Sequence, residues 1–279
     1  MLDYLAIGHI SKDVMADGRG VAGGTATYSA LTAQRLGLQA AVVTYCAPED
    51  EHLLAVLLDE GVWVHVKHSP ATTTFQNSYD EAGNRAQVLT AQAASLSYDD
   101  VPELWRAAPI VHLGPVAQEL PSDLPAMFPG CLLGVTPQGW MRSWGQGGRV
   151  THSAWPVPNA LHDLPPGALL ILSVEDLGHD ERLIDHYAGL ASVVVITQGG
   201  GDALVYVEGR HYSRVPAHQA QSVDPTGAGD VFAAALMVRY SETGDLLLAT
   251  RFAHAAAAHA IGGVGTSAIP AREVLNSQF

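Results

Sequence analysis

The residues best suited to catalysis lie near the carboxyl end of the chain, in the run DPTGAGD at residues 224–230. An apolar stretch with helical character, residues 231–240, follows directly. Small residues before a helix let the backbone approach a ligand closely, and the free N–H groups of the first helical turn attract negative charge. Asp230 falls in that first turn, where its carboxylate can take a proton from a hydroxyl that attacks a phosphate in line. The run predicts a site for phosphoryl transfer, with Gly227, Ala228 and Gly229 as its anion-binding loop.

A structural explanation of the same run is that Asp230 only complements the helix dipole while the glycines make a tight turn. The full run, however, resembles the signature of the ribokinase or PfkB carbohydrate kinase family, a D-T/P-x-G-A-G-D loop near the carboxyl end. A Walker A lysine run, an HExxH motif and a GxGxxG after the first strand are all missing from the sequence. The resemblance implies a kinase that uses ATP and Mg²⁺, with Asp230 as its general base.

A second resemblance to this family lies near the amino end, where Asp13 follows the first predicted strand and Gly23 and Gly24 precede the first predicted helix. In that family the aspartate holds sugar hydroxyls, and the paired glycines let the substrate press against the backbone. By themselves, an aspartate after a strand is an ordinary turn residue and two glycines are an ordinary flexible loop. The sequence departs from the family at Tyr28, where many members carry asparagine, so the substrate is expected to differ from ribose.

The donor end resembles the family at residues 196–201, where ITQGGG follows a buried strand in the place of the family's T-x-G-x-x-G segment beside the ATP phosphates. The alternative is a glycine turn between two strands. The residues that the resemblance assigns to ATP are Thr197, Gly199, Gly201, Thr226, Gly227, Gly229 and Gly263. Gly263 belongs to the small-residue segment 253–265, which either borders the adenine or only lets two helices pack closely.

Three carboxylates are candidates for metal ions. Glu175 and Asp176 occupy the place of the family's N-x-x-E element and would organise Mg²⁺ through water, unless they only cap the following helix. Asp224, together with Thr226, is the candidate site for a monovalent cation such as K⁺, as in some relatives.

A further polar run, TPQGWMR at residues 136–142, follows another predicted strand. It resembles the P-Q-G-W/F-x-R run of inositol kinase relatives within this family. Gln138 and Arg142 are the predicted substrate-binding residues, because a guanidinium can bridge a hydroxylated substrate and a phosphate. The alternative is a surface loop held by an aromatic anchor.

These motifs need a scaffold that brings their residues together. Short apolar runs alternate with amphipathic segments, beginning with a strand at residues 4–8, a helix at 25–36 and a strand at 40–44. Further strands are predicted at residues 110–114, 131–136, 169–173 and 193–197, several without polar alternation, as in strands buried on both faces. The pattern predicts an α/β fold of the ribokinase-like type, a doubly wound and mainly parallel sheet with helices on both faces. Its ligands would bind beyond the carboxyl ends of the strands.

One segment breaks this alternation. Residues 72–79 and 85–90 have the pattern of two strands joined by the turn 80–84, which predicts a hairpin at about residues 70–92. The hairpin is interpreted as a reduced lid on a single kinase domain of residues 1–279, although a surface excursion fits the pattern equally. Phe75, Asn77 and Tyr79 alternate along it and face one side, so Asn77 is the lid residue expected to touch the substrate. Residues 138–148, rich in glycine, are predicted to form a loop.

Composition narrows the class of protein. Of the 279 residues 48% are apolar and 15% are charged, which suits a folded globular chain. The net charge of −14, with Lys12 and Lys67 as the only lysines, disfavours nucleic acid and anionic membranes as partners. Cys46 and Cys131 are too few for a disulfide scaffold or a four-ligand zinc site. Because no targeting segment or membrane span is evident either, a cytoplasmic protein is expected.

The sequence thus predicts phosphoryl transfer from MgATP to a hydroxyl of a small polyol. A cyclitol such as myo-inositol is favoured over ribose by Tyr28, by the short segment between Asp13 and Gly23, and by the run at residues 136–142. A phosphorylated sugar would need additional cationic anchors in a chain nearly without lysine. A nucleoside kinase or another sugar kinase of the same fold stays an alternative, as does a catalytically silent ligand-binding sensor. The oligomeric state, monomer or homodimer, is open.

Overall fold

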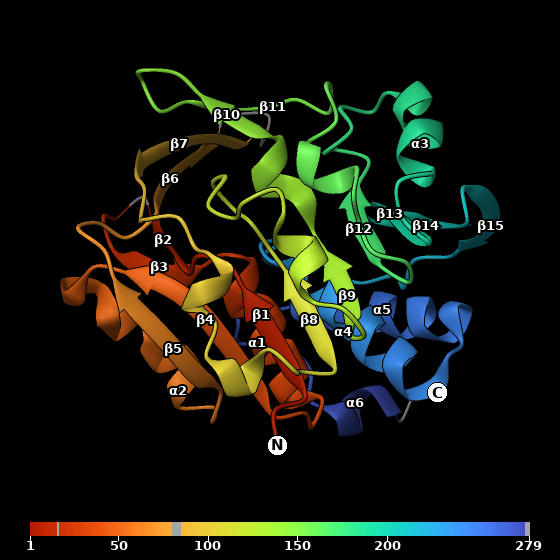
Figure 1. Cartoon of the computed structure of the whole chain (residues 1–279), viewed down its shortest axis with the longest axis horizontal. Coiled ribbons are helices and arrows are strands. Elements are labelled where there is room, and N and C mark those ends of the chain that lie inside the picture. Colours follow the sequence, from red (N-terminus) through yellow and green to blue (C-terminus); the bar gives the residue numbers. More distant parts are fainter. Residues whose placement is uncertain (16, 80–84, 277–279) are drawn as a thin grey trace.

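The computed structural model describes residues 1–15, 17–79 and 85–276, and its centre is a nine-stranded sheet (Figure 1). In spatial order the strands are β15 (Arg210–Val215), β14 (Gly201–Val207), β13 (Val193–Gln198), β12 (Leu169–Ser173), β9 (Leu132–Val135), β8 (Ile110–Leu113), β1 (Tyr4–Ile7), β4 (Ala40–Cys46) and β5 (Trp63–His68). All neighbours from β13 to β5 are parallel, whereas β14 and β15 extend the β13 edge as antiparallel strands. The predicted doubly wound, mainly parallel α/β fold is therefore confirmed.

Both faces of this sheet are buried, because its strands carry apolar side chains on both sides. Tyr4 and Ala6 of β1 belong to the core under α1 (Thr25–Arg35), α4 (Ala228–Thr243) and α5 (Leu246–Ala260). Leu5 and Ile7 belong to a second core, which α3 (Glu181–Ala188) and several short 3-10 helices cover. The remaining helices are α2 (Ala55–Leu58), α6 (Arg272–Asn276) and the 3-10 helices Pro48–Leu54, Tyr98–Asp100, Glu103–Trp105, Leu124–Met127, Pro137–Met141 and Asn159–Leu161.

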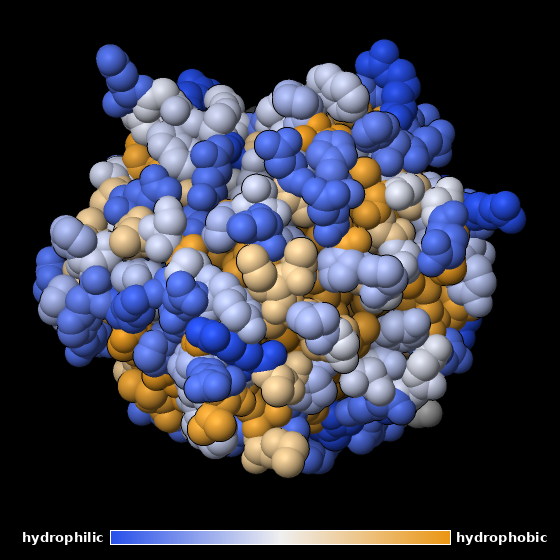
Figure 2. All heavy atoms as spheres, in the orientation of Figure 1, coloured by the Kyte–Doolittle hydropathy of each residue, from blue (hydrophilic) through white to orange (hydrophobic). Residues whose placement is uncertain are grey.

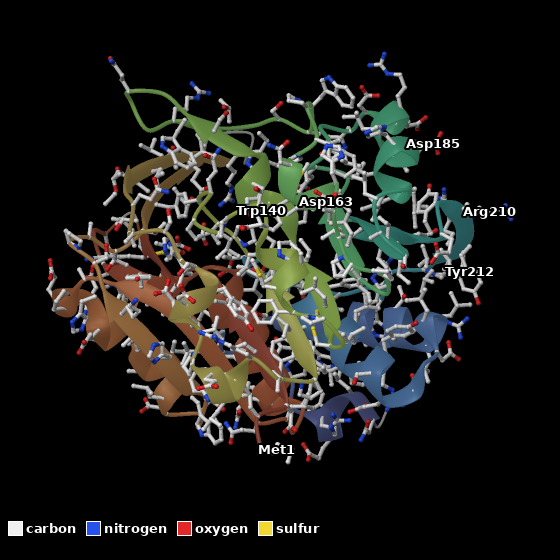
Figure 3. All side chains as sticks on the ribbon, viewed as in Figure 1. Met1, Trp140, Asp163, Asp185, Arg210 and Tyr212 are labelled. Atoms are coloured by element: carbon white, nitrogen blue, oxygen red, sulfur yellow. The ribbon has the colours of Figure 1, made fainter. Side chains whose placement is uncertain are left out.

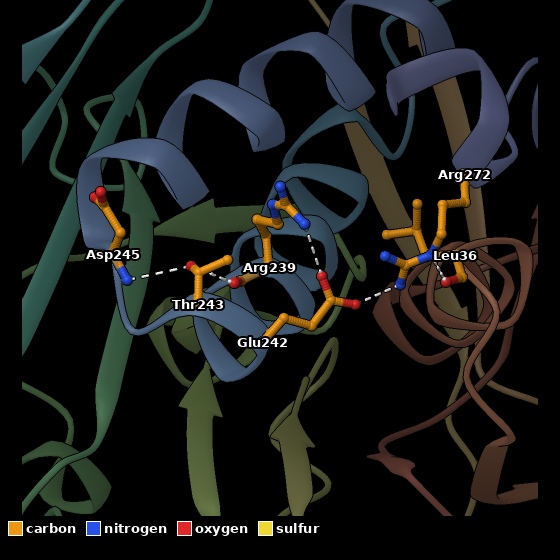
Figure 4. A network of polar contacts seen from close by, with 6 residues as sticks. All are labelled: Leu36, Arg239, Glu242, Thr243, Asp245 and Arg272. Atoms are coloured by element: carbon orange, nitrogen blue, oxygen red, sulfur yellow. Dashed lines mark hydrogen bonds and ion pairs between the residues drawn. The ribbon is translucent and has the colours of Figure 1, made fainter. Parts of the chain in front are cut away.

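Helix α4 carries the DPTGAGD motif at its amino end and is held firmly along its length. Residues 231–238 are all buried, since the helix packs between the sheet, α1 and α5. Figure 4 shows the polar network at its other end. Glu242 pairs with Arg239 at 3.1 Å and with Arg272 at 2.5 Å, and Arg272 also donates to the carbonyl of Leu36 after α1. The first turn of α4 is thus presented by a helix that is fixed at its far end.

A second, four-stranded sheet lies above the amino-terminal half of the central one (Figure 1). Its strands run in the order β3 (Gly20–Gly23), β2 (Ser11–Val14), β6 (Thr74–Tyr79) and β7 (Arg85–Ala91). The strands of the predicted hairpin are β6 and β7, and its predicted turn at residues 80–84 lies outside the described residues. The sequence did not indicate that β2 and β3 join this hairpin through the parallel pairing of β2 with β6, which places Asp13 within a strand.

A third, two-stranded sheet corrects the prediction of a loop over residues 138–148. These residues form the 3-10 helix Pro137–Met141, then β10 (Arg142–Trp144), which pairs with β11 (Val150–His152). The hairpin forms because Trp144 and Val150 pack on the apolar cluster around Phe75 and Leu89 of the four-stranded sheet. The backbone N–H of Leu89 donates to the carbonyl of Gly148 at 2.8 Å, so the two sheets are directly joined.

The face drawn in Figure 2 carries hydrophilic side chains over most of its area, with apolar side chains between them. Of the helices in the described part of the chain, none combines the length and the apolar character that a bilayer span needs.

Candidate active site

Most of the residues singled out in the sequence surround one cavity of about 780 Å³, beyond the carboxyl ends of the central strands. They are Asp13, Gly24, Gln138, Arg142, Glu175, Asp176, Thr197, Gly199, Thr226, Gly227, Ala228, Gly229 and Asp230. A second hollow of about 710 Å³ lies beside the α4–α5 turn, and its described lining includes none of them. The two cavities are separate: Figure 3 shows Tyr212, at the second hollow, far from Trp140 of the Pro137–Met141 helix, which contributes Gln138 to the first cavity. The first cavity is the candidate active site.

The anion-binding loop is built by one left-handed glycine at the start of α4. Gly227 is the N-cap residue with φ 78°, and a Cβ there would lie 2.2 Å from the ring of Tyr28. The N–H of Ala228 is taken by the carbonyl of Pro225 at 3.2 Å, which leaves the first-turn amides of Gly229 and Asp230 for a ligand. A Cβ on Gly229 would meet no atom within 4 Å, so the space beside this residue is open to the cavity. The loop fits the approach of a phosphoryl group.

Asp230 is only partly exposed, and the pKa of its carboxyl group is raised toward neutral pH. Removal of water raises the pKa of Asp230 to about 6, and the hydrogen bond from Thr25 and the positive charge of Arg142 oppose this rise. The negative charges of Asp176 and Asp13 also contribute to this raised pKa. A carboxylate with such a pKa is largely ionised at pH 7 and still basic enough to accept a proton from a hydroxyl.

Asp13, another residue of the cavity lining, is held in a close-fitting position. Ser11 Oγ donates to Asp13 Oδ1 at 3.2 Å, and a Cβ on Gly23 would lie 2.4 Å from Asp13 Oδ2. Gly23 is therefore needed behind the carboxylate, whereas Gly24 lines the cavity itself. Gly24 has φ 88°, and a Cβ there would lie 2.6 Å from the carbonyl oxygen of His9. Both glycines keep the backbone close to the space that a substrate would fill.

Arg142 brings a buried positive charge to the cavity. Its side chain is 6% exposed, Nη1 donates to the carbonyl of Val116 at 2.9 Å, and the guanidinium lies 5.3 Å from the centre of the Phe75 ring. The loop that supplies this carbonyl is itself ordered by Glu119, a fully buried carboxylate that accepts from the N–H groups of Val116 at 2.9 Å and Ala117 at 2.7 Å. This support makes the guanidinium a fixed charge and not a mobile surface one.

The strand pairing in the β6–β7 hairpin, the predicted lid, places a different side chain at the cavity from the one expected. Asn77 pairs with Gln87 across β6 and β7, and Gln87 Nε2 donates to Asn77 Oδ1 at 3.0 Å. Gln87 and Phe75 line the cavity, whereas Asn77 is absent from its described lining. The predicted contact of Asn77 with substrate would therefore act through Gln87.

At the donor end the cavity is bordered by Thr197, Gly199 and Thr226. Gly201 and Gly263 are not in its described lining. Gly201 begins β14, and a Cβ on Gly263 would lie 2.7 Å from the Cβ of Ala268 in the turn that follows α5. The described lining thus includes residues predicted to contact the donor phosphates, but not the glycine predicted to border the adenine.

The predicted metal residues have different surroundings. Asp176 is buried, accepts from the N–H and the hydroxyl of Ser173 at 2.8 and 3.1 Å, and lies 3.4 Å from Gln138 Nε2, while Glu175 is exposed. No group of three metal-binding side chains occurs among the described residues. This donor set fits Mg²⁺, which proteins hold with one or two carboxylates together with the phosphates of a ligand. Asp224 accepts from the amides of Thr226 and Gly265, so it orders the loop. The monovalent cation at Asp224 stays a prediction.

Several polar side chains of the cavity were not singled out as site residues by the sequence, namely Thr25, Gln87, Thr136 and His179. Thr136 follows β9 directly, and its place after a parallel strand was an available signal. Thr25 and Gln87 reach the cavity only through tertiary packing, for which the sequence held no local signal.

The model of the pfkB family of carbohydrate kinases matches residues 169–272 of this chain. A cytidine kinase of Thermococcus kodakarensis is 30% identical over 259 residues, which cover 86% of this chain and 89% of the relative.

Solved structures agree with this match. A pyrophosphate-dependent kinase in the ribokinase family, in complex with a pyrophosphate analog and myo-inositol, is 25% identical with a TM-score of 0.78 over 98% of this chain and 99% of that one. A ribokinase of Arabidopsis thaliana in complex with ribose and ATP is 20% identical with a TM-score of 0.75 over 99% and 98%, which shows a shared fold. These similarities extend over nearly the whole chain.

Proposed function

Since this chain belongs to the pfkB family of carbohydrate kinases, we propose that it transfers a phosphoryl group to a hydroxyl of a small neutral polyol with Asp230 as the general base. The observation that carries the proposal is the position of Asp230, which lies in the first turn of α4 beside the open space at Gly229. Asp13 and Arg142, which we assign to the acceptor, and Thr197 and Gly199, which we assign to the donor, line the same cavity.

In this mechanism the acceptor hydroxyl gives its proton to the Asp230 carboxylate as its oxygen attacks the terminal phosphorus, and the bond from phosphorus to the leaving oxygen breaks. The amides of Gly229 and Asp230 and the guanidinium of Arg142 stabilise the charge on the transferring group. Asp13 orients the acceptor through its other hydroxyls. Mg²⁺, held by Glu175 or Asp176 together with the phosphates of the donor, would neutralise the remaining negative charge.

For the acceptor we propose a cyclitol such as myo-inositol. Tyr28 is buried against Gly227 at the cavity wall, in the place of the asparagine of many relatives, and the four charged carboxylates of the lining suit a neutral ligand. The myo-inositol bound to the neighbour that is 25% identical supports the same choice. A nucleoside is the second candidate, because the relative that is 30% identical is described as a cytidine kinase.

For the donor we propose ATP, with pyrophosphate as the second candidate. Two observations favour that second donor: the 25% identical neighbour is pyrophosphate-dependent, and Gly263, the residue assigned to the adenine end, is outside the described cavity lining.

The test combines each donor, MgATP or Mg-pyrophosphate, with myo-inositol, cytidine, ribose and fructose 6-phosphate, and detects the phosphorylated product by ³¹P NMR and mass spectrometry. Direct detection is needed because a coupled ADP assay would miss pyrophosphate turnover. We expect product from a neutral acceptor and none from fructose 6-phosphate, with the Asp230→Asn protein as the inactive control. Preference for the phosphosugar would refute the acceptor class, and binding without any turnover would support the silent sensor instead.

A further inference from the structure

A chain of buried polar side chains connects the interior of the central sheet to the active-site cavity. Tyr4 on β1 and His112 on β8 are 0% and 1% exposed, and the Tyr4 hydroxyl lies 2.6 Å from His112 Nδ1. On the other side of the imidazole, His112 Nε2 lies 3.0 Å from Thr136 Oγ1, just after β9. Of the three side chains, Thr136 lines the cavity.

The two distances indicate which group donates in each hydrogen bond. A hydroxyl donor makes shorter hydrogen bonds, about 2.7 Å, than an N–H donor, about 2.9 to 3.0 Å. The 2.6 Å contact therefore fits donation by the Tyr4 hydroxyl to Nδ1, and the 3.0 Å contact fits donation by Nε2–H to Thr136. In this arrangement Thr136 accepts from His112, and its own hydroxyl proton is left for a partner in the cavity.

The arrangement is not expected to change with pH in the neutral range. Burial lowers the pKa of His112 to about 3 and raises the pKa of Tyr4, so both side chains stay neutral. The titratable groups that influence the phenol include Asp230, whose negative charge also raises the pKa of Tyr4.

A purely structural role would not explain why the chain of hydrogen bonds ends at the cavity. Tyr4 belongs to an apolar core, and its hydroxyl satisfies His112 Nδ1, which a phenylalanine at this position would leave without a partner. Gly114 leaves room beside Thr136, the end of the network at the cavity. A Cβ on Gly114 would lie 2.3 Å from Thr25 and 3.5 Å from Thr136 Oγ1. Thr25 serves Asp230, whereas Thr136 is not among the groups that influence that carboxylate.

We propose that Thr136 is a substrate-contacting residue that donates its hydroxyl proton to an oxygen of the acceptor, and that Tyr4 and His112 are positioning residues that fix this direction of donation. The inference rests on the proposed function, because it assigns the contact to the acceptor of that reaction. It explains how a neutral polyol can be recognised in a cavity whose charged side chains are mostly acceptors of hydrogen bonds.

The kinetic test compares Thr136→Val, which keeps the shape and loses the hydroxyl, with Thr136→Ser, which keeps the hydroxyl. We expect Thr136→Val to lower kcat/KM for the acceptor by about 10- to 100-fold while it still folds, with a lower melting temperature because His112 Nε2–H loses its acceptor, and Thr136→Ser to stay within about fivefold of wild type. The midpoint of the pH profile should be the same in all three proteins, because Asp230 sets it. Equal kcat/KM in the valine and wild-type proteins would overturn the proposal, as would a shifted midpoint.

The second test does not depend on turnover. In ¹⁵N NMR spectra of the protein labelled at histidine, His112 should carry its proton on Nε2, and Tyr4→Phe should allow the Nδ1–H form and raise the KM for the acceptor severalfold. A proton on Nδ1 in the wild type would reverse the assigned donation and refute the inference. Absence of phosphoryl transfer to every acceptor, with Nε2–H still observed, would instead refute the proposed function.

Discussion

Ionisation of the Asp230 carboxyl group should increase catalytic activity and decrease the stability of the fold. The pKa near 6 means that the proton acceptor is formed only above that pH, so kcat/KM should rise through about pH 6 to a plateau. Asp230→Asn should lower kcat by at least about 10²-fold at pH 8, because the amide cannot accept the proton. A pH–rate profile of the wild type and single-turnover rates of both proteins check this. Turnover of the asparagine protein near the wild-type level would exclude Asp230 as the base.

The same carboxylate should lower the stability of the wild type at neutral pH. Its pKa is about 6 in the fold and about 3.8 when unfolded, so the penalty is absent below about pH 4 and complete above about pH 6. The difference amounts to at most about 3 kcal/mol. Asp230→Asn should therefore melt above the wild type at pH 8 and together with it at pH 4, as measured by circular dichroism. Coincident melting curves at pH 8 would indicate a well-hydrated carboxylate.

Gly227 and Gly229 are needed for different reasons, and alanine separates them. At Gly227 the methyl group would strike Tyr28 in a left-handed backbone, so Gly227→Ala should lose about 2 kcal/mol or more of stability together with activity. At Gly229 the methyl group meets no protein atom, so Gly229→Ala should keep its melting temperature and lose about tenfold or more in kcat/KM. Each protein is the control for the other. Full activity of Gly229→Ala would remove this position from phosphoryl binding.

Among the elements, the β10–β11 hairpin connects the four-stranded sheet to the cavity. Gly148 has φ 67°, and a Cβ there would lie 2.2 Å from the carbonyl oxygen of Leu89 on β7. Gly148→Ala should separate the two sheets locally, which displaces Gln87 on one side and Arg142 on the other. We expect the KM for the acceptor to rise by about threefold or more with a smaller change in kcat.

The matched control for this element is Gly147→Ala, since a Cβ at Gly147 meets nothing within 4 Å and its φ is not positive. Steady-state kinetics with varied acceptor should show wild-type behaviour for this control. Identical KM values for the two alanine proteins would mean that the attachment of the hairpin to β7 does not position the acceptor.

For the whole molecule, the charge of −14 opposes the approach of any anionic phosphate donor. Salt screens this repulsion over a distance of about 10 Å at 0.1 M. The kcat/KM for MgATP should therefore stay constant or rise up to about threefold as NaCl increases from about 20 to 200 mM. The kcat/KM for a neutral acceptor, measured in the same buffers, should not change and serves as the control. A severalfold fall for MgATP would point to a local basic surface that outweighs the net charge.

The sequence by itself determined the candidate base, the glycine loop before it and most of the secondary structure around them. These features depend on contiguous residues: a buried parallel strand is an apolar run, and the start of α4 is a short run of small residues before an apolar helix. The predicted helix at residues 25–36 and the observed α1, Thr25–Arg35, agree for this reason.

Only the tertiary structure decided which side chains meet. The pairing of β2 with β6, the position of Gln87 in place of Asn77 at the cavity, and the support of the Arg142 loop by Glu119 all depend on strand order and register. The Tyr4–His112 contact joins residues 108 positions apart, and no local pattern encodes it. Register shifts of one residue exchange the two faces of a strand, so these contacts are set by the packing of the whole sheet and not by any one segment.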